Sequence, residues 1–143
     1  MDALKLLTER YSEKKLSAPA PDKHQLTQMF QAALRSPDHG RLQPYRFIVI
    51  EQDKMTELSR LLKSAVHELN LGEERLKKAE NLATRAPMII GVVAKIDPNI
   101  KKVPEWEQLL CAGCATYAIQ LAANALGFKN VWVSGPWLDG TDL

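Results

Sequence analysis

The chain has 143 residues, 45% of them hydrophobic and 25% charged, so it is long enough to bury a core without metal ions or disulfides. Its 19 Lys and Arg residues against 17 Asp and Glu leave a net charge of +2, which gives no reason to expect a nucleic acid as a partner. The longest apolar run, residues 88–94, is far too short to span a membrane, and the first residues show no signal-peptide pattern. We therefore expect a cytoplasmic protein with no membrane contact.

Hydrophobic spacing and terminating residues divide the chain into alternating helices and strands. Asp22 followed by Gln25 is typical of a capping box, and Asp53 is a further candidate cap. Pro104 suits the first turn of a helix, and Gly127 suits the position just after one. In chain order, the patterns predict a helix at 2–10, an extended piece at 12–16, a helix at 22–34, a strand at 45–51, helices at 53–69 and 73–82, a strand at 87–94, a helix at 104–126 and a strand at 131–133.

Three short strands among these helices indicate an α/β or α+β layered domain. The strand at 87–94 is continuously apolar, which predicts burial on both of its faces. The long helix at 104–126 has a middle rich in Ala and Gly, which predicts close approach to another backbone. Three strands make a thin sheet for a chain of this length.

The two cysteines, Cys111 and Cys114, form a C-x-x-C pattern inside the long helix. A redox-active pair works best at the N-terminus of a helix, where the helix dipole lowers the pKa of a thiol. This pair lies about two turns inside, so we interpret both residues as small packing residues. We expect no metal site, because a zinc site needs four ligands and the chain has no second Cys pair and no paired His.

The sequence contains no G-x-G-x-x-G motif for dinucleotide binding, no P-loop motif and no G-x-S-x-G motif of a catalytic serine. Residues 12–15 match the S-x-x-K motif, which we interpret as accidental. What remains is a set of polar residues at the ends of predicted elements. Arg10 and Arg35 could each hold a phosphate or carboxylate through a bidentate fork. His39 lies in a loop between a helix and a strand, where functional residues are common.

Together these residues resemble the nitroreductase family. The resemblance covers essentially the whole chain, and its specificity lies in the combination of segments. Residues 1–12 are similar to the family's first helix and R-R-S motif, 34–39 with 43–47 to its A-P-S…Q-P-W-x-F segment, 85–90 to its A-P entry to a buried strand, 103–107 with the helix to 128 to its Ala/Gly-rich helix, and 132–135 to its last segment.

The resemblance implies an α+β, three-layer nitroreductase-like fold in which helices flank a central mixed sheet. It implies an FMN-dependent enzyme, an NAD(P)H nitroreductase, that passes a hydride from NAD(P)H through flavin to a nitroaromatic or quinone acceptor by a ping-pong mechanism. The flavin carries out the chemistry, so no protein side chain is expected to be catalytic. The family's homodimer places two flavin sites at the subunit interface.

The resemblance also assigns the cofactor-binding residues. Arg10, Tyr11 and Ser12 would hold the phosphate and ribityl chain. Arg35 and His39 would reach the flavin bound mainly by the partner subunit. The isoalloxazine ring would lie beside the segment Trp132, Val133 and Ser134, where backbone N–H groups can approach it.

The chain departs from the family pattern in three places. Tyr11 replaces the second Arg of R-R-S, and Tyr45 replaces the Trp of Q-P-W. Family members continue past Ser134 and Gly135 with a further helix, a core strand and a tail, so we expect residues 1–143 to be a single domain whose C-terminal segment is missing. Two alternatives remain open: a truncated relative without flavin activity that serves as a dimerising or interaction domain, and a thiol oxidoreductase that uses the two cysteines.

Overall fold

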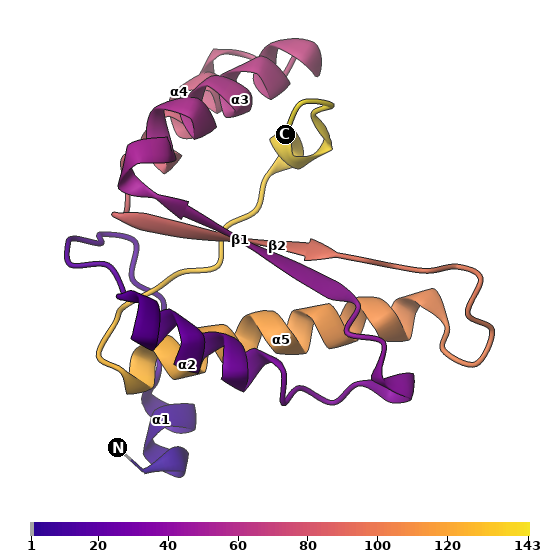
Figure 1. Cartoon of the computed structure of the whole chain (residues 1–143). Coiled ribbons are helices and arrows are strands. Elements are labelled where there is room, and N and C mark those ends of the chain that lie inside the picture. The colour runs from indigo at the N-terminus through magenta and orange to yellow at the C-terminus, as the bar shows by residue number, and fades with distance from the viewer. Residues whose placement is uncertain (1) are drawn as a thin grey trace. The chain divides into compact units, whose positions relative to one another are not determined.

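The computed structural model describes residues 2–143, whose elements are shown in Figure 1. Residues 2–12, Pro21–Val49 and Ile90–Asn130 form one compact unit, and Glu13–Ala20, Ile50–Ile89 and Val131–Leu143 form a second. The elements are α1 (Ala3–Glu9), α2 (Lys23–Ala33), β1 (Tyr45–Glu51), α3 (Met55–Glu68), α4 (Glu73–Leu82), β2 (Met88–Ala94) and α5 (Glu105–Ala125), with 3-10 turns at His39–Arg41, Gln52–Lys54 and Pro136–Asp139.

The first unit is built on the packing of α2 against α5, which run alongside each other in Figure 1. Small side chains on both helices allow this close packing, and α1 also contacts α5. The buried core of this unit is Met29, Ala33, Tyr45, Cys111, Ala112, Ala115, Ile119 and Ala123.

Local hydrogen bonds at the ends of these two helices confirm the predicted caps. The Asp22 carboxylate accepts from the Gln25 N–H at 2.8 Å, and the Gln25 side chain accepts from the Asp22 N–H at 2.9 Å. At the end of α5, Gly127 has a φ of 92°, and the Phe128 N–H donates to the Ala123 carbonyl at 2.9 Å. A residue with a side chain would be strained at that φ, which is why the helix ends at a glycine.

The second unit packs α3 and α4 around a buried tryptophan, Trp137, in the C-terminal 3-10 turn. Leu62, Ala65, Val66 and Ala79 complete its core. The segment after Trp137 is held to α3, because the backbone N–H of Thr141 donates to Glu68 at 3.0 Å and the hydroxyl of Thr141 donates to the same carboxylate.

The two strands form a two-stranded sheet. The N–H of Lys95 donates to the carbonyl of Pro44 at 2.9 Å, so the end of β2 lies beside the start of β1 and the strands are antiparallel. The α+β class is confirmed. Within residues 2–143 the sheet is antiparallel, where a mixed sheet was predicted.

Three local predictions are wrong. Residues 131–133 are irregular, because within the described residues only β1 and β2 pair and a β-prone segment forms no strand without a partner. Asp53 caps no helix, since it lies inside a 3-10 turn and Lys54 is the N-cap of α3. No residue of β2 is buried in this chain. In the described part of the chain, no helix is long and apolar enough to cross a bilayer.

Candidate functional site

The predicted phosphate-binding segment, residues 10–12, follows directly on α1 in the first unit. Nη2 of Arg10 donates to the hydroxyl of Ser12 at 3.3 Å, so the structure brings these two side chains together. Nε of Arg10 is buried, and among the described residues it has no hydrogen-bond partner. A buried donor without a partner is costly, and a bound anion would satisfy it.

A residue that the sequence did not indicate lies next to this segment. The ammonium of Lys129 is 4.5 Å from the centre of the Tyr11 ring, at the usual distance of a cation–π contact. Within residues 2–143 no carboxylate pairs with either Arg10 or Lys129. Residues 10–12 and 129 therefore form a small region of positive charge, which we call the Arg10 cluster.

The loop that carries His39 is held by its own hydrogen bonds and contains residues with strained backbone. The Asp38 carboxylate accepts from the N–H groups of Leu42 at 3.1 Å and Gln43 at 2.8 Å. Gly40, Arg41 and Gln43 have φ values of 79°, 52° and 47°, all in the left-handed region. Strain of this kind persists only where the surroundings hold it, and it is common at functional sites.

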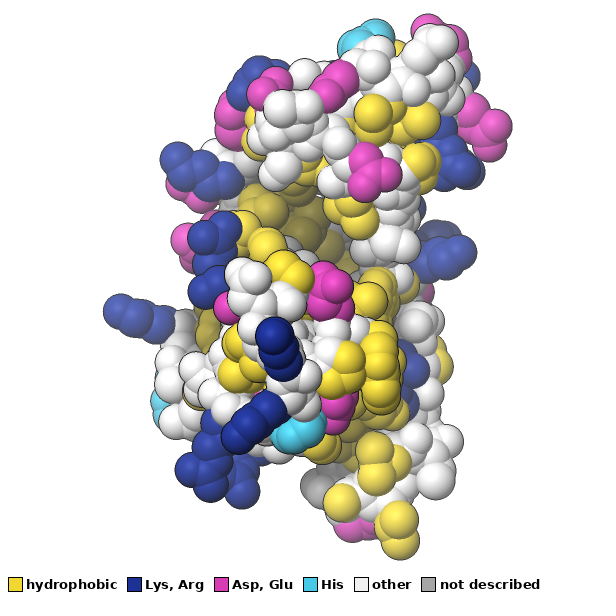
Figure 2. Space-filling view, turned by 90° about the vertical axis from the view of Figure 1, so that its right-hand side faces the viewer, with side chains coloured by type: hydrophobic (Ala, Val, Ile, Leu, Met, Phe, Trp, Pro, Cys, Tyr) yellow, Lys and Arg dark blue, Asp and Glu magenta, His cyan; other side chains and the backbone are white. Residues whose placement is uncertain are grey.

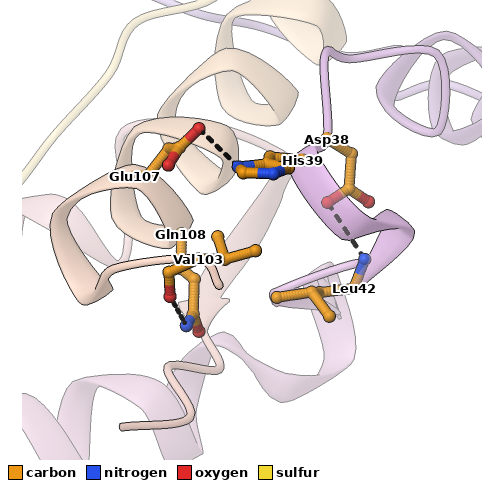
Figure 3. A network of polar contacts seen from close by, with 6 residues as sticks. All are labelled: Asp38, His39, Leu42, Val103, Glu107 and Gln108. Carbon is orange, nitrogen blue, oxygen red and sulfur yellow. Dashed lines mark hydrogen bonds and ion pairs between the residues drawn. The ribbon is translucent and has the colours of Figure 1, made fainter. Parts of the chain in front are cut away.

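His39 is oriented by an acidic residue in the first turn of α5. Its Nδ1 lies 2.9 Å from Oε1 of Glu107, with the two side chains 54% and 33% exposed (Figure 3). When Nδ1–H donates to this carboxylate, Nε2 is the ring nitrogen left for a ligand. No local pattern indicates this pair, because its members are 68 positions apart in the chain.

Below this pair, the amide of Gln108 joins the loop before α5 to the helix itself (Figure 3). Gln108 is 1% exposed. Its Nε2 donates to the carbonyls of Val103 at 2.9 Å and Asp97 at 3.0 Å, and its Oε1 accepts from the Asp97 N–H at 2.8 Å. Val103 in turn lies against Gly40, where an added methyl group would come within 3.2 Å of it.

The remaining predicted site residues are exposed. Arg35 lies just after α2, and within residues 2–143 no carboxylate pairs with it. Neither Arg35 nor His39 makes a described hydrogen bond to residues 10–12. In the second unit, Trp132, Val133 and Ser134 are exposed, and their N–H groups make no backbone hydrogen bond in the described part of the chain. Free N–H groups here are compatible with the predicted contact to a flavin ring.

The environment of the cysteines disfavours thiol redox chemistry. Cys111 and Cys114 are both free, the first buried and the second exposed. Burial, helped by the nearby negative charge of Asp38, raises the pKa of the Cys111 thiol to about 11. A thiol reacts as the thiolate, which is nearly absent at neutral pH when the pKa is so high.

One face of α5 is apolar and exposed in this chain. Trp106, Leu110 and Tyr117 are 64%, 61% and 40% exposed, and they recur at helical spacing. Between them lies Gly113, beside which an added Cβ would meet no other atom. Hydrophobic side chains are visible at the molecular surface among the charged ones (Figure 2). The first unit therefore covers only one face of α5, so the close contact predicted for its small residues is made on that face and not on the exposed one.

Two surface hollows lie in the second unit and contain none of the predicted site residues. The larger has a volume of about 620 Å³, and two pairs of oppositely charged side chains lie in or beside it, Arg60 with Glu57 and Lys63 with Glu80. The smaller, of about 150 Å³, lies between α3 and α4. Because the cations of the larger hollow are already paired, that hollow does not point to an anionic ligand.

Comparison with known proteins matches residues 7–139 to the model of the "Nitroreductase family". A Haemophilus influenzae protein, named provisionally as an NAD(P)H nitroreductase, is 66% identical over 143 residues, all of this chain and 78% of the relative. YdjA of Escherichia coli K12, with the same provisional name, is 44% identical over 135 residues, 94% of this chain and 73% of YdjA.

A solved FMN-dependent nitroreductase from Clostridium difficile R20291 is 26% identical, with a TM-score of 0.65 over 92% of this chain and 65% of its own. The nitroreductase-like α+β fold expected from the sequence is thus confirmed. By the extent of the family match and the identity to its relatives, the chain belongs to the nitroreductase family.

Proposed function

We propose that this chain is an FMN-dependent oxidoreductase that uses NAD(P)H to reduce a nitroaromatic or quinone-type acceptor. The observation that carries the proposal is the Arg10 cluster. It offers a guanidinium bonded to a hydroxyl, together with a buried Nε that has no partner in residues 2–143. These donors fit a phosphate ester, which binds best to charged donors in fixed positions. The solved FMN-dependent nitroreductase to which the chain is similar supports the same cofactor.

On this proposal the described side chains bind and orient the cofactor, and none acts as an acid or base. Arg10 and Ser12 hold the phosphate, and Tyr11 lies beside the ribityl chain. Trp132, Val133 and Ser134 offer their backbone N–H groups to the ring. The chemistry that FMN supplies when bound is two-electron transfer, with a hydride taken from NAD(P)H and passed to the acceptor in a second half-reaction.

We further propose that the enzyme is a homodimer in which Arg35 and His39 serve the flavin of the partner subunit. The length of α5 supports this arrangement. His39 is bonded to the first turn of α5, whereas Tyr11 contacts Lys129 beyond its last turn. A helix of 21 residues is about 32 Å long, which is longer than one extended FMN molecule. A single FMN therefore does not reach both ends.

The exposed apolar face of α5 supports the same dimer. Faces of this kind are normally covered in an assembly, because contiguous exposed apolar surface is unfavourable in water. The open position at Gly113 lets a second backbone approach closely. We also propose a reducing, cytoplasmic compartment, with which the two free cysteines are compatible.

The first test is the visible absorption spectrum of the purified protein, with and without added FMN. The proposal requires a bound-flavin spectrum that NADH or NADPH bleaches and that a quinone restores. Initial rates at several fixed acceptor concentrations should give parallel double-reciprocal lines, as expected for a ping-pong mechanism. A colourless protein that does not take up FMN would overturn the proposal and favour an interaction domain without flavin.

Replacement of Arg10 separates a specific phosphate contact from general charge. Arg10→Ala should weaken FMN binding by about 1.5–3 kcal/mol, the usual contribution of a hydrogen bond to a charged group. The matched control is Arg46→Ala, which removes an exposed arginine from β1 in the same unit and should leave FMN affinity unchanged. Equal effects of the two replacements would contradict the role of Arg10.

A further inference from the structure

Lys129 is held in place by anchored residues on both sides. Before it, Phe128 ends α5 by donating its N–H to the Ala123 carbonyl at 2.9 Å. After it, Asn130 exchanges two hydrogen bonds with Gln120, one at 3.0 Å to its side chain and one at 3.2 Å to its carbonyl. The backbone at position 129 is therefore fixed relative to α5, and only the side chain of Lys129 can change its conformation to reach different partners.

That side chain reaches toward the phosphate-binding segment. Its ammonium lies 4.5 Å from the centre of the ring of Tyr11, the residue between Arg10 and Ser12 in the sequence. Among residues 2–143 no carboxylate neutralises it. A cation–π contact at an exposed site is worth only about 0.5–1 kcal/mol, so the ammonium is positioned without being held tightly.

A phosphate monoester carries a charge of about −1.5 to −2 at neutral pH, and a single arginine balances only about half to two-thirds of it. We propose that Lys129 supplies the second positive charge to the cofactor phosphate at Arg10 and Ser12, with the Tyr11 ring as the platform that holds the ammonium there. This inference rests on the proposed function, because it deepens the flavin site. It assigns a ligand contact to a residue beyond the end of α5.

The test compares FMN with riboflavin, which has the same ring and ribityl chain but no phosphate. Lys129→Gln should weaken FMN binding roughly tenfold, the lower range for a lost charged hydrogen bond, and leave riboflavin binding unchanged. Lys129→Arg should keep most of the FMN affinity. The matched control is Lys101→Gln, which removes an exposed lysine from a loop of the same unit and should change neither affinity.

A compensating replacement makes the test independent of folding. Adding Tyr11→Arg to the Lys129→Gln protein returns a positive charge to the same place and should restore most of the lost FMN affinity. If Lys129→Gln leaves FMN affinity unchanged, or weakens FMN and riboflavin equally, the inference is overturned while the proposed function stands. If the unaltered protein binds neither flavin, the proposed function fails and the inference fails with it.

Discussion

The buried amide of Gln108 joins the loop before α5 to the helix itself, and Gln108→Met removes it at nearly constant volume. The three hydrogen bonds of this amide join Asp97 and Val103 to α5. A net contribution of about 0.5–1.5 kcal/mol for each bond gives about 1.5–4.5 kcal/mol. Water can reach the part-buried Asp97 groups in the variant but not the buried Val103 carbonyl. We therefore expect a loss of about 2–4 kcal/mol in the free energy of unfolding.

Urea unfolding followed by tryptophan fluorescence measures this loss, with the protein concentration held constant because assembly also affects stability. The control is Gln31→Met, an exposed glutamine on α2, which should change stability by less than about 0.5 kcal/mol. A loss below about 1 kcal/mol for Gln108→Met would refute the reasoning, since it would mean that the Val103 carbonyl finds another partner without cost.

Three further predictions follow from other contacts. The bonds from Thr141, first that of its hydroxyl, hold the pKa of Glu68 below its ordinary value of 4.5. Thr141→Val should therefore be less stable than the unaltered protein above pH 4.5, and this difference in stability should disappear as the pH falls through the lower pKa of the folded state. A difference in stability that grows in acid would contradict this. In the Cys114→Ser protein, alkylation of Cys111 at pH 8 should be roughly 100-fold slower in the folded state than in the unfolded state, because a pKa of about 11 instead of 9.0 lowers the fraction of thiolate. Equal rates in the two states would contradict the burial of the Cys111 thiol. Leu110→Asp should convert the proposed dimer to monomers in sedimentation experiments, and an unchanged dimer mass would place the interface elsewhere.

The predictions from sequence that were confirmed depend on residues close together in the chain. The reciprocal bonds of Asp22 and Gln25 span three positions, and the stop at Gly127 depends on its own backbone angle. The strand at Tyr45–Glu51 and the helix at Glu73–Leu82 were predicted with the bounds that they have in the structure. In each case the local preference and the tertiary fold agree, so the pattern is sufficient.

The failures depend on partners that the local pattern does not contain. A run of β-branched and aromatic residues such as Val131–Val133 suits a strand, but whether it becomes one depends on a free sheet edge elsewhere in the fold. Glu107 and Lys129 carry no motif of their own, and only the fold places them beside His39 and Tyr11. The family resemblance predicted Arg10 and its neighbours because those residues recur as a motif, whereas residues that act through long-range contacts leave no such signal.

The proposal that each flavin site combines Arg10 of one subunit with His39 of the other can be tested with a mixed dimer of one Arg10→Ala subunit and one His39→Ala subunit. If each flavin site takes Arg10 from one subunit and His39 from the other, one site carries both replacements and the other carries neither. Such a dimer should bind one FMN with the affinity of the unaltered protein. If both residues came from the same subunit, each site would carry one replacement and no site would keep full affinity. Titration with FMN distinguishes the two cases, because only in the first case do half of the flavin sites bind FMN with unaltered affinity. A uniformly weakened titration would show that His39 serves the flavin of its own subunit, and the argument from the length of α5 would then be wrong.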